Sequence, residues 1–202
     1  MKITCIPSGM LQANTYIVAE ENTNKAFIVD PGGYSKKTVD LINNENYELE
    51  YIILTHGHSD HTDGVAEYKR LFPAAKIVAC EKERELLEDP RKSMSYGPID
   101  FEVEIWVKDG DVLKLGDKEL KILHTPGHTP GGMCILVENH LFSGDTLFQY
   151  SIGRTDFWGG SFADIKKSIQ NKLYVLHDDT IVYPGHMGTT TIGAEKRGNP
   201  FV

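Results

Sequence analysis

Short apolar runs rich in β-branched residues alternate along the chain with longer stretches in which apolar residues recur every three or four positions. The short runs predict buried strands, and the longer periodic stretches predict helices. The expected strands are residues 2–6, 14–19, 26–30, 50–55, 76–80, 111–115, 118–124, 132–137, 140–143 and 180–184. The expected helices are residues 35–46, 61–72, 81–88 and 162–176, of which the polar stretch 81–88 has the weakest pattern.

The order of these elements distinguishes between fold classes. The first strands follow one another as in hairpins, strand–helix units come next, and hairpins return after residue 105. A doubly wound parallel sheet would instead alternate strand and helix throughout. The order therefore favours an α/β protein with largely antiparallel or mixed sheets. Since no repeat or linker divides the chain, we expect residues 1–202 to form a single domain.

The composition narrows the choice of partner and compartment. In 202 residues, 29 Asp and Glu against 21 Lys and Arg give a net charge of −8, which disfavours broad binding to nucleic acids. No apolar run approaches the ~20 residues of a membrane helix, and the N-terminus lacks the apolar stretch of a secretory signal. The three cysteines are widely spaced, which favours the cytoplasm, and we expect Cys5 and Cys134 to be free, buried thiols.

Four side chains that can bind metals stand close together in the stretch Thr55-His56-Gly57-His58-Ser59-Asp60-His61. In an extended backbone, His56, His58 and Asp60 project to one side, and His61 breaks the alternation. A single ion could hardly bind four adjacent side chains, so the stretch predicts a site for two neighbouring metal ions. A polar turn in which Asp60 caps the next helix is the alternative, but capping requires no histidines.

Three more candidate ligands each follow an expected strand and stand beside glycine. They are His128 in the stretch 125–132, Asp145 after strand 140–143 and His186 after strand 180–184. Loops that follow strands gather on a rigid scaffold, so we expect these side chains to join the first group. Histidine nitrogen and carboxylate oxygen suit Zn²⁺, Fe or Mn, and the spacing of the ligands does not choose among them.

In this order, the motifs resemble those of the metallo-β-lactamase superfamily, and the chain is most similar to the glyoxalase II group and its short bacterial relatives. The similarity runs from the Val29-Asp30-Pro31-Gly32 turn to the Tyr183-Pro184-Gly185-His186 end and includes residues 143–148, 151–156 and 190–196. It implies a four-layer αββα sandwich with metal ions at one edge. Full glyoxalase II enzymes have a helical C-terminal domain, for which the few residues after His186 are not enough.

The resemblance implies two metal sites that share a bridging aspartate. The first is formed by His56, His58 and His128, the second by Asp60, His61 and His186, and the bridge is Asp145. Asp30 matches an aspartate that supports the ligands in this family, although it suits a turn before Pro31-Gly32 equally well. Arg154 matches a basic substrate contact, and an ion pair with Asp156 is the alternative.

The implied activity is hydrolysis of a hydroxyacyl thioester similar to S-lactoylglutathione by a metal-bound hydroxide, with Asp60 as the catalytic group that takes its proton. Two divalent metal ions are the expected cofactors, Zn²⁺ first, with Fe or Mn as alternatives. An iron-dependent persulfide dioxygenase is the alternative activity, because that group shares the stretch 153–156.

Two other activities and a non-catalytic role are disfavoured. Class B lactamases typically lack an aspartate at the bridging position, which argues against antibiotic hydrolysis. The acidic balance argues against a nuclease, and the intact ligand set argues against a non-catalytic domain.

Overall fold

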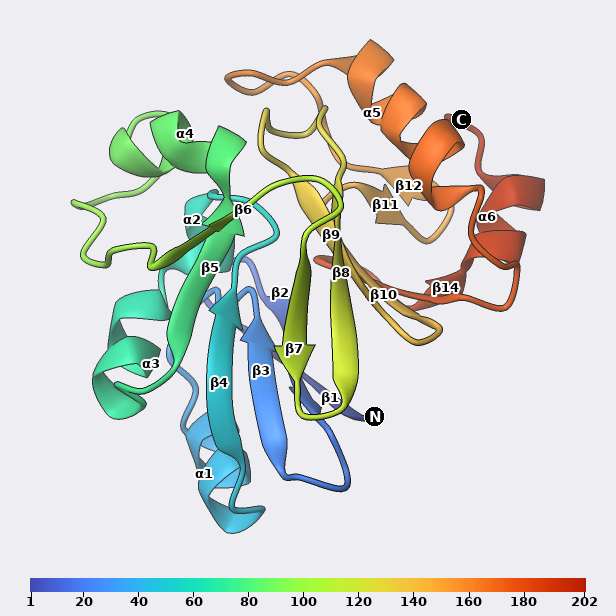
Figure 1. The fold of residues 1–202 in the computed structure, drawn as a ribbon. Helices are drawn as coiled ribbons and strands as arrows, with labels where there is room; N and C mark the ends of the chain where they lie inside the picture. The colour runs from blue at the N-terminus through green and yellow to red at the C-terminus, as the bar shows by residue number, and fades with distance from the viewer.

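Two six-stranded β-sheets pack face to face, and helices cover the outer face of each sheet (Figure 1). The computed structural model describes residues 1–202. The N-terminal part of the chain forms one sheet with its helices, and the C-terminal part forms the other. Helix, sheet, sheet and helix make a four-layer αββα sandwich, as the resemblance implies.

The first sheet is mixed. Its strands, in spatial order, are β1 (Lys2–Ser8), β2 (Ala13–Ala19), β3 (Lys25–Val29), β4 (Glu48–Ile53), β5 (Lys76–Cys80) and β6 (Ile105–Val107). Strands β1 to β3 are antiparallel neighbours, and β3 to β6 are parallel. Parallel neighbours need a crossover, and helices fill the connections on either side of β4.

The second sheet is largely antiparallel. Its order is β14 (Thr190–Thr191), β13 (Ile181–Pro184), β10 (His140–Gly144), β9 (Met133–Val137), β8 (Lys118–His124) and β7 (Val112–Leu115). Only β10 and β13 pair in parallel. A separate hairpin consists of β11 (Leu147–Phe148) and β12 (Ser151–Ile152). These two sheets confirm the prediction of a mixed, largely antiparallel arrangement.

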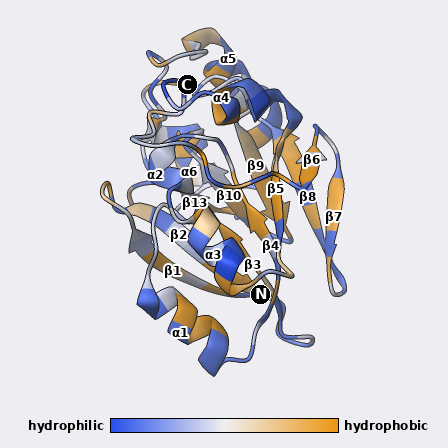
Figure 2. Cartoon of the chain, turned by 90° about the vertical axis from the view of Figure 1, so that its left-hand side faces the viewer, coloured by the Kyte–Doolittle hydropathy of each residue, from blue (hydrophilic) through white to orange (hydrophobic).

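The helices are short and amphipathic. Helices α1 (Lys36–Asn44) and α3 (Val65–Leu71) cover the first sheet, and α5 (Phe162–Ser168) and α6 (Ile192–Gly198) cover the second. Figure 2 shows that hydrophobic residues concentrate in the strands and that α1 carries both hydrophobic and hydrophilic residues. A π-helical turn, Ile169–Leu173, extends α5. None of the helices is long and apolar enough to cross a membrane.

The expected helix 61–72 is interrupted. A single turn, α2 (Ser59–Thr62), precedes α3, and Asp63 and Gly64 separate them. The Gly64 N–H donates to the carbonyl of Pro31 at 2.8 Å instead of to a carbonyl one turn earlier. The stretch 81–88, whose helical pattern in the sequence is the weakest, is helical: a 3₁₀ turn at Glu81–Glu83 is followed by α4 (Arg84–Glu88).

Five elements have no counterpart in the sequence analysis: β6, β11, β12, β14 and α6. The strands among them have only two or three residues, too few to show an alternating pattern. Helix α6 contains two glycines and few apolar residues, and it begins where the Thr191 hydroxyl accepts from the Ala194 N–H.

The prediction that Cys5 and Cys134 are both buried is wrong for one of them. Cys134 is buried, but Cys5 is exposed, because it lies on the edge strand β1.

Three hydrophobic clusters hold the layers together. The central cluster lies between the sheets, where Phe142 contacts Tyr16 and Phe27 edge-on, with ring centroids 5.4 and 5.8 Å apart. A second cluster joins the first sheet to α1 and α3, and a third joins the other sheet to α5 and α6. Because both faces of the central strands are covered, the loops at the strand ends start from a fixed frame.

Candidate metal centre

The candidate ligands from both sheets meet at one edge of the sandwich. They follow the ends of four strands: β4 leads to residues 56–61, β8 to His128, β10 to Asp145 and β13 to His186. Nitrogen and oxygen atoms of these side chains fall into two groups of three, each within 4.8 Å. Asp145, the seventh candidate, lies within 3.4–3.8 Å of histidines in both groups, so the structure gathers all seven, although His56 and His186 are 130 positions apart in sequence.

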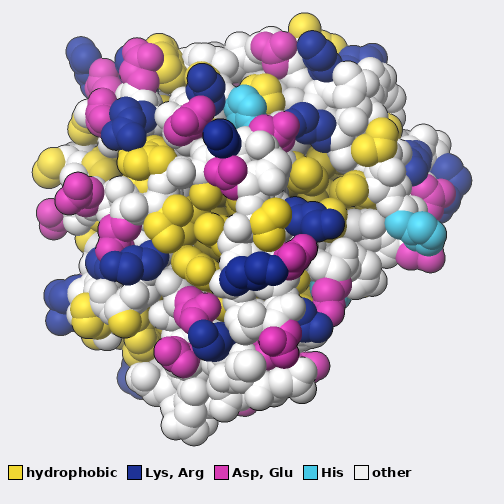
Figure 3. Space-filling model, in the orientation of Figure 1, with side chains coloured by type: hydrophobic (Ala, Val, Ile, Leu, Met, Phe, Trp, Pro, Cys, Tyr) yellow, Lys and Arg dark blue, Asp and Glu magenta, His cyan; other side chains and the backbone are white.

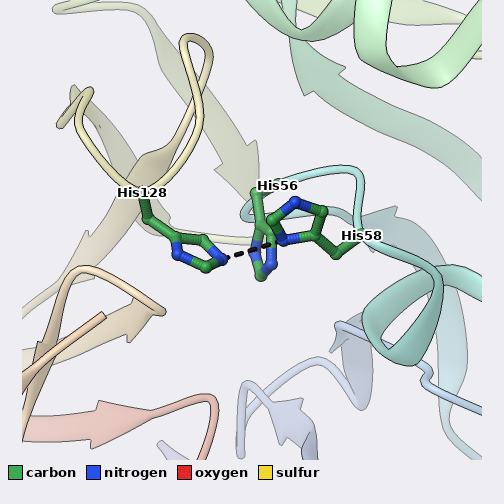
Figure 4. Close-up of side chains that lie close together, drawn as sticks. All are labelled: His56, His58 and His128. Atoms are coloured by element: carbon green, nitrogen blue, oxygen red, sulfur yellow. Dashed lines mark hydrogen bonds between the residues drawn. The ribbon is translucent and has the colours of Figure 1, made fainter. Parts of the chain in front are cut away.

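The first group consists of three buried histidines, His56, His58 and His128 (Figure 4). Nδ1 of His58 and Nε2 of His128 lie 2.9 Å apart, and the His56 ring centroid is 4.9 and 4.7 Å from those of the other two. Nitrogens that bind one tetrahedral metal ion at about 2.0–2.1 Å lie roughly 3.3 Å from one another. Small side-chain adjustments would bring these three rings to that spacing.

The second group consists of Asp60, His61 and His186. Nε2 of His186 lies 3.2 Å from Oδ2 of Asp60 and 3.3 Å from Nε2 of His61. Asp60 thus lies with His61, and not with His56 and His58 as the alternation of an extended chain suggests. The reason is that α2 begins at Ser59 and ends the extended backbone.

Asp145 lies between the two groups. Its Oδ2 is 3.7 Å from Nε2 of His128, and its Oδ1 is 3.4 Å from Nε2 of His61. Close approach at this point depends on Gly185, because a Cβ there would lie 2.3 Å from Oδ1 of Asp145 and 2.6 Å from the His61 ring. Oδ2 also lies 3.8 Å from Nε2 of His186, so the carboxylate is close to both groups, as a bridging ligand would be.

The donor atoms fit metal ions. Among buried side-chain nitrogens and oxygens, four have no hydrogen-bond partner, and three of these are Nε2 of His56, Nε2 of His58 and Oδ1 of Asp145. Buried polar atoms without partners are costly and rare in native proteins. His56 and Asp145 direct theirs into the candidate site, where divalent ions with a preference for nitrogen and oxygen would satisfy them.

Two groups outside the candidate set orient the histidines. Asp30 is buried, and its Oδ2 lies 3.0 Å from Nδ1 of His61, while its carboxylate also accepts from the N–H and hydroxyl of Thr55 at 2.7 and 2.5 Å. Nδ1 of His128 donates to the carbonyl of Arg154 at 2.7 Å. Each contact occupies Nδ1 and leaves Nε2 facing the site, so Asp30 supports the site and does not merely form a turn.

Glu83, which the sequence pattern did not single out, connects the two loops that carry the first group. Its Oε1 accepts from the N–H of Gly57 at 2.9 Å, and its Oε2 accepts from the N–H of Gly131 at 2.6 Å and the hydroxyl of Thr129 at 3.1 Å. A Cβ at Gly131 would lie 2.4 Å from Oε2, so the contact requires glycine. Burial raises the pKa of Glu83 to about 7, against the effect of the three donors.

The two groups differ in charge. Burial, helped by His128, lowers the pKa of His58 to about 3, so this ring is neutral and has a free lone pair at neutral pH. Burial also lowers the pKa of His61, but Asp145, Asp30 and Asp60 outweigh it and raise the value to about 10. The second group therefore holds a proton that a bound metal ion would displace.

A cavity of about 520 Å³ opens over both groups. Arg154 lines it, but its guanidinium makes a double hydrogen bond to Asp156 at 2.7 and 2.8 Å and stacks over Phe157. The ion pair that was the alternative to a substrate contact is therefore present. A substrate contact by Arg154 stays a prediction, because it would have to compete with Asp156.

The sequence matches a known family model and a curated relative over nearly its whole length. The family model for the metallo-beta-lactamase superfamily matches residues 8–186, which include every candidate ligand. The hydroxyacylglutathione hydrolase GloC of Haemophilus influenzae is 38% identical over 209 residues, covering 100% of this chain and 98% of that protein.

Solved structures show the same fold. The crystal structure of BLEG-1 B3 metallo-beta-lactamase superposes with a TM-score of 0.90 at 35% identity and covers 99% of both chains. The crystal structure of ETHE1 from Myxococcus xanthus superposes with a TM-score of 0.84 at 27% identity, covering 99% of this chain and 84% of the other.

Proposed function

The chain belongs to the metallo-β-lactamase superfamily, and we propose that it is a metal-dependent hydrolase that cleaves a hydroxyacyl thioester of the S-lactoylglutathione type. The observation that carries the proposal is the arrangement of two donor groups around Asp145 beneath one cavity. The similarity to the hydroxyacylglutathione hydrolase GloC supports the choice of substrate class.

The assignment of ligands follows the geometry. His56, His58 and His128 would hold one metal ion, Asp60, His61 and His186 would hold the other, and Asp145 would contact both. When bound, the ions would supply a Lewis acid and lower the pKa of water from about 15.7 to about 7. Zn²⁺ is our first choice of metal, with Fe and Mn as alternatives.

Asp60 is the residue that we assign to proton transfer. Burial raises the pKa of Asp60, but His186 and His61 outweigh burial and lower the value to about 2, so the carboxylate is ionised at neutral pH. An ionised carboxylate at the cavity wall can orient a water molecule and accept its proton. The neighbouring hydroxyl of Ser59 donates to the carbonyl of Met94.

A thioester suits this set of residues for a chemical reason. A thiolate leaving group has a conjugate acid with a pKa of about 8.5, so it departs without a general acid. An amide would require a proton donor beside the leaving nitrogen, and Asp60 is ionised. The face of the molecule shown in Figure 3 intermingles Lys and Arg with Asp and Glu, which gives no support to a nuclease.

The test measures thiol release from S-lactoylglutathione by protein loaded with Zn²⁺, Fe²⁺ or Mn²⁺. We expect release that His58→Ala reduces at least about a hundredfold, because the variant removes a ligand. His177→Ala is the matched control, since the side chain of His177 is 81% exposed and does not line the cavity. No release from any thioester with any metal would contradict the proposal, and cleavage of a β-lactam alone would favour the activity named for BLEG-1.

An iron-dependent persulfide dioxygenase is the second candidate. The stretch 153–156 favours it, and the structural likeness to ETHE1 is compatible with it. Metal analysis separates the two activities: one Fe per chain with oxygen uptake on a persulfide would favour the dioxygenase, whereas two metal ions with thiol release would favour the hydrolase.

A further inference from the structure

The cavity over the candidate metal centre has an apolar rim. Twelve large hydrophobic side chains of the molecule are exposed, and five of them line this one cavity: Met10, Leu11, Met94, Tyr96 and Met187. Phe148, Ile152 and Phe157 extend the apolar lining inward. Single exposed apolar residues are ordinary, but a cluster at the mouth of a cavity marks a binding surface.

Three separate segments build this rim. Met10 and Leu11 belong to the connection between β1 and β2, Met94 and Tyr96 to the long segment between α4 and β6, and Met187 follows His186. The backbone at two of these positions is fixed: the carbonyl of Met94 accepts from Ser59, and that of Met187 accepts from Asn14. Both residues have a positive φ, +59° and +69°, which is unfavourable for a side chain of this size and recurs at ligand-binding sites.

The walls of the cavity outside the candidate metal centre offer little to attract an anionic carrier. Arg154 is the only Lys or Arg in the lining, and Asp156 already neutralises it. Outside the candidate metal ligands, the lining contains one carboxylate, Asp63, and the chain carries a net charge of −8. The carboxylates of a glutathione carrier would therefore find no free Lys or Arg on the walls outside the candidate metal centre.

We propose that the cavity binds an uncharged thioester with an extended apolar arm in preference to a thioester of the anionic carrier glutathione. The proposal rests on the proposed thioester hydrolase activity and assigns it an uncharged carrier in place of glutathione as the preferred one. Flexible methionine side chains on three segments can adapt to an aliphatic arm, and burial of that arm against them drives binding.

The first experiment compares kcat/KM for matched thioesters with the metal-loaded protein. Acetyl, butyryl and hexanoyl thioesters of N-acetylcysteamine vary the apolar arm, and S-hexanoylglutathione changes only the carrier. We expect kcat/KM to rise about fourfold with each added methylene and to be about tenfold higher for the neutral hexanoyl ester than for the glutathione ester.

Substitutions at the rim test which side chains bind the arm. Met10→Ser and Tyr96→Ser change residues that are 83% and 94% exposed, so the fold should tolerate them. Both variants should reduce the increase of kcat/KM with the length of the acyl chain. Val175→Ser is the matched control, because Val175 is 70% exposed and lies outside the cavity, and it should leave that dependence unchanged.

A binding measurement separates this proposal from the activity. Calorimetry with the thioethers S-hexyl-N-acetylcysteamine and S-hexylglutathione, which cannot be hydrolysed, should show tighter binding of the neutral compound and a negative heat-capacity change. Tighter binding of the glutathione thioether, or kcat/KM independent of chain length, would overturn the proposal and leave the hydrolase activity standing.

Two other outcomes are distinguishable. Tight binding of the neutral thioether without hydrolysis of any thioester would support the cavity preference and overturn the hydrolase. A stable dimer that Tyr96→Ser converts to monomers, with no thioether binding, would assign the rim to a second copy of the chain and overturn the proposal.

Discussion

At the scale of single residues, the candidate centre depends on groups that are not candidate ligands. Asp30 makes three contacts within the buried layer beneath the site, two with Thr55 and one with Nδ1 of His61. It adopts a positive φ of +50°, which aspartate tolerates better than most residues. The residue that follows β3 thus both turns the chain and fixes the orientation of a histidine.

We expect Asp30→Ala to destabilise the protein and weaken the second metal site. Each buried donor that loses its acceptor costs about 1–3 kcal/mol, so the free energy of unfolding should fall by about 3 kcal/mol or more. Loss of such an orienting group typically lowers metal affinity by about 10–100-fold. Urea unfolding measures the first effect and metal titration the second.

Asp179→Ala provides the comparison, because Asp179 is 89% exposed and should change neither quantity. Unchanged affinity for the second metal ion in Asp30→Ala would show that His61 needs no orienting partner.

At the scale of elements, the short helical segment after β5 connects the loop that contains His56 and His58 to the loop that contains His128. Glu83 bonds to Gly57, which lies between His56 and His58, and to the loop that follows His128. The helical pattern of residues 81–88 is weak, and it does not show the contacts that Glu83 makes with these loops. Its partners lie 26 to 48 positions away in sequence.

Glu83→Ala should separate these loops. The variant leaves the Gly57 and Gly131 N–H groups and the Thr129 hydroxyl without acceptors, so we expect a loss of about 3 kcal/mol in the free energy of unfolding and weaker binding of the first metal ion. Calorimetric metal titration and urea unfolding check the two effects.

Glu83→Gln keeps one acceptor oxygen and nearly the same volume, so it should recover part of both losses. Glu81→Ala is the control on the same turn, because Glu81 is exposed. Equal metal affinity in Glu83→Ala and the unchanged protein would restrict the role of Glu83 to folding.

At the scale of the whole molecule, the centre exists because two sheets present their strand ends at the same edge. Strand β4 of the first sheet supplies residues 56–61, and β8, β10 and β13 of the second sheet supply the rest. The central hydrophobic cluster fixes the distance between the sheets, and Phe142 packs there against rings of the opposite sheet.

Phe142→Ala should therefore weaken the whole sandwich. Truncation of a buried phenylalanine typically costs about 3–5 kcal/mol. We expect a corresponding fall in the free energy of unfolding in urea, whereas Phe201→Ala, at a residue that is 44% exposed, should have little effect. A small decrease in the free energy of unfolding of Phe142→Ala would show that the central cluster can repack into the space left by the ring.

The sequence by itself determined which donor side chains the candidate centre contains and most of the strands that carry them. The ten expected strands are present because alternating and apolar runs are local signals that burial in a sheet preserves. The identities of the seven candidate ligands were visible because histidines and aspartates next to glycine, directly after strands, are unusual in a purely structural role.

The tertiary structure alone decided how these residues combine. The contacts of Asp30 and Glu83, the position of Asp145 between the two donor groups and the apolar rim depend on segments far apart in the chain. A local pattern records which residues a strand or turn can contain. It does not record which loops meet, because that depends on how the two sheets pack against each other.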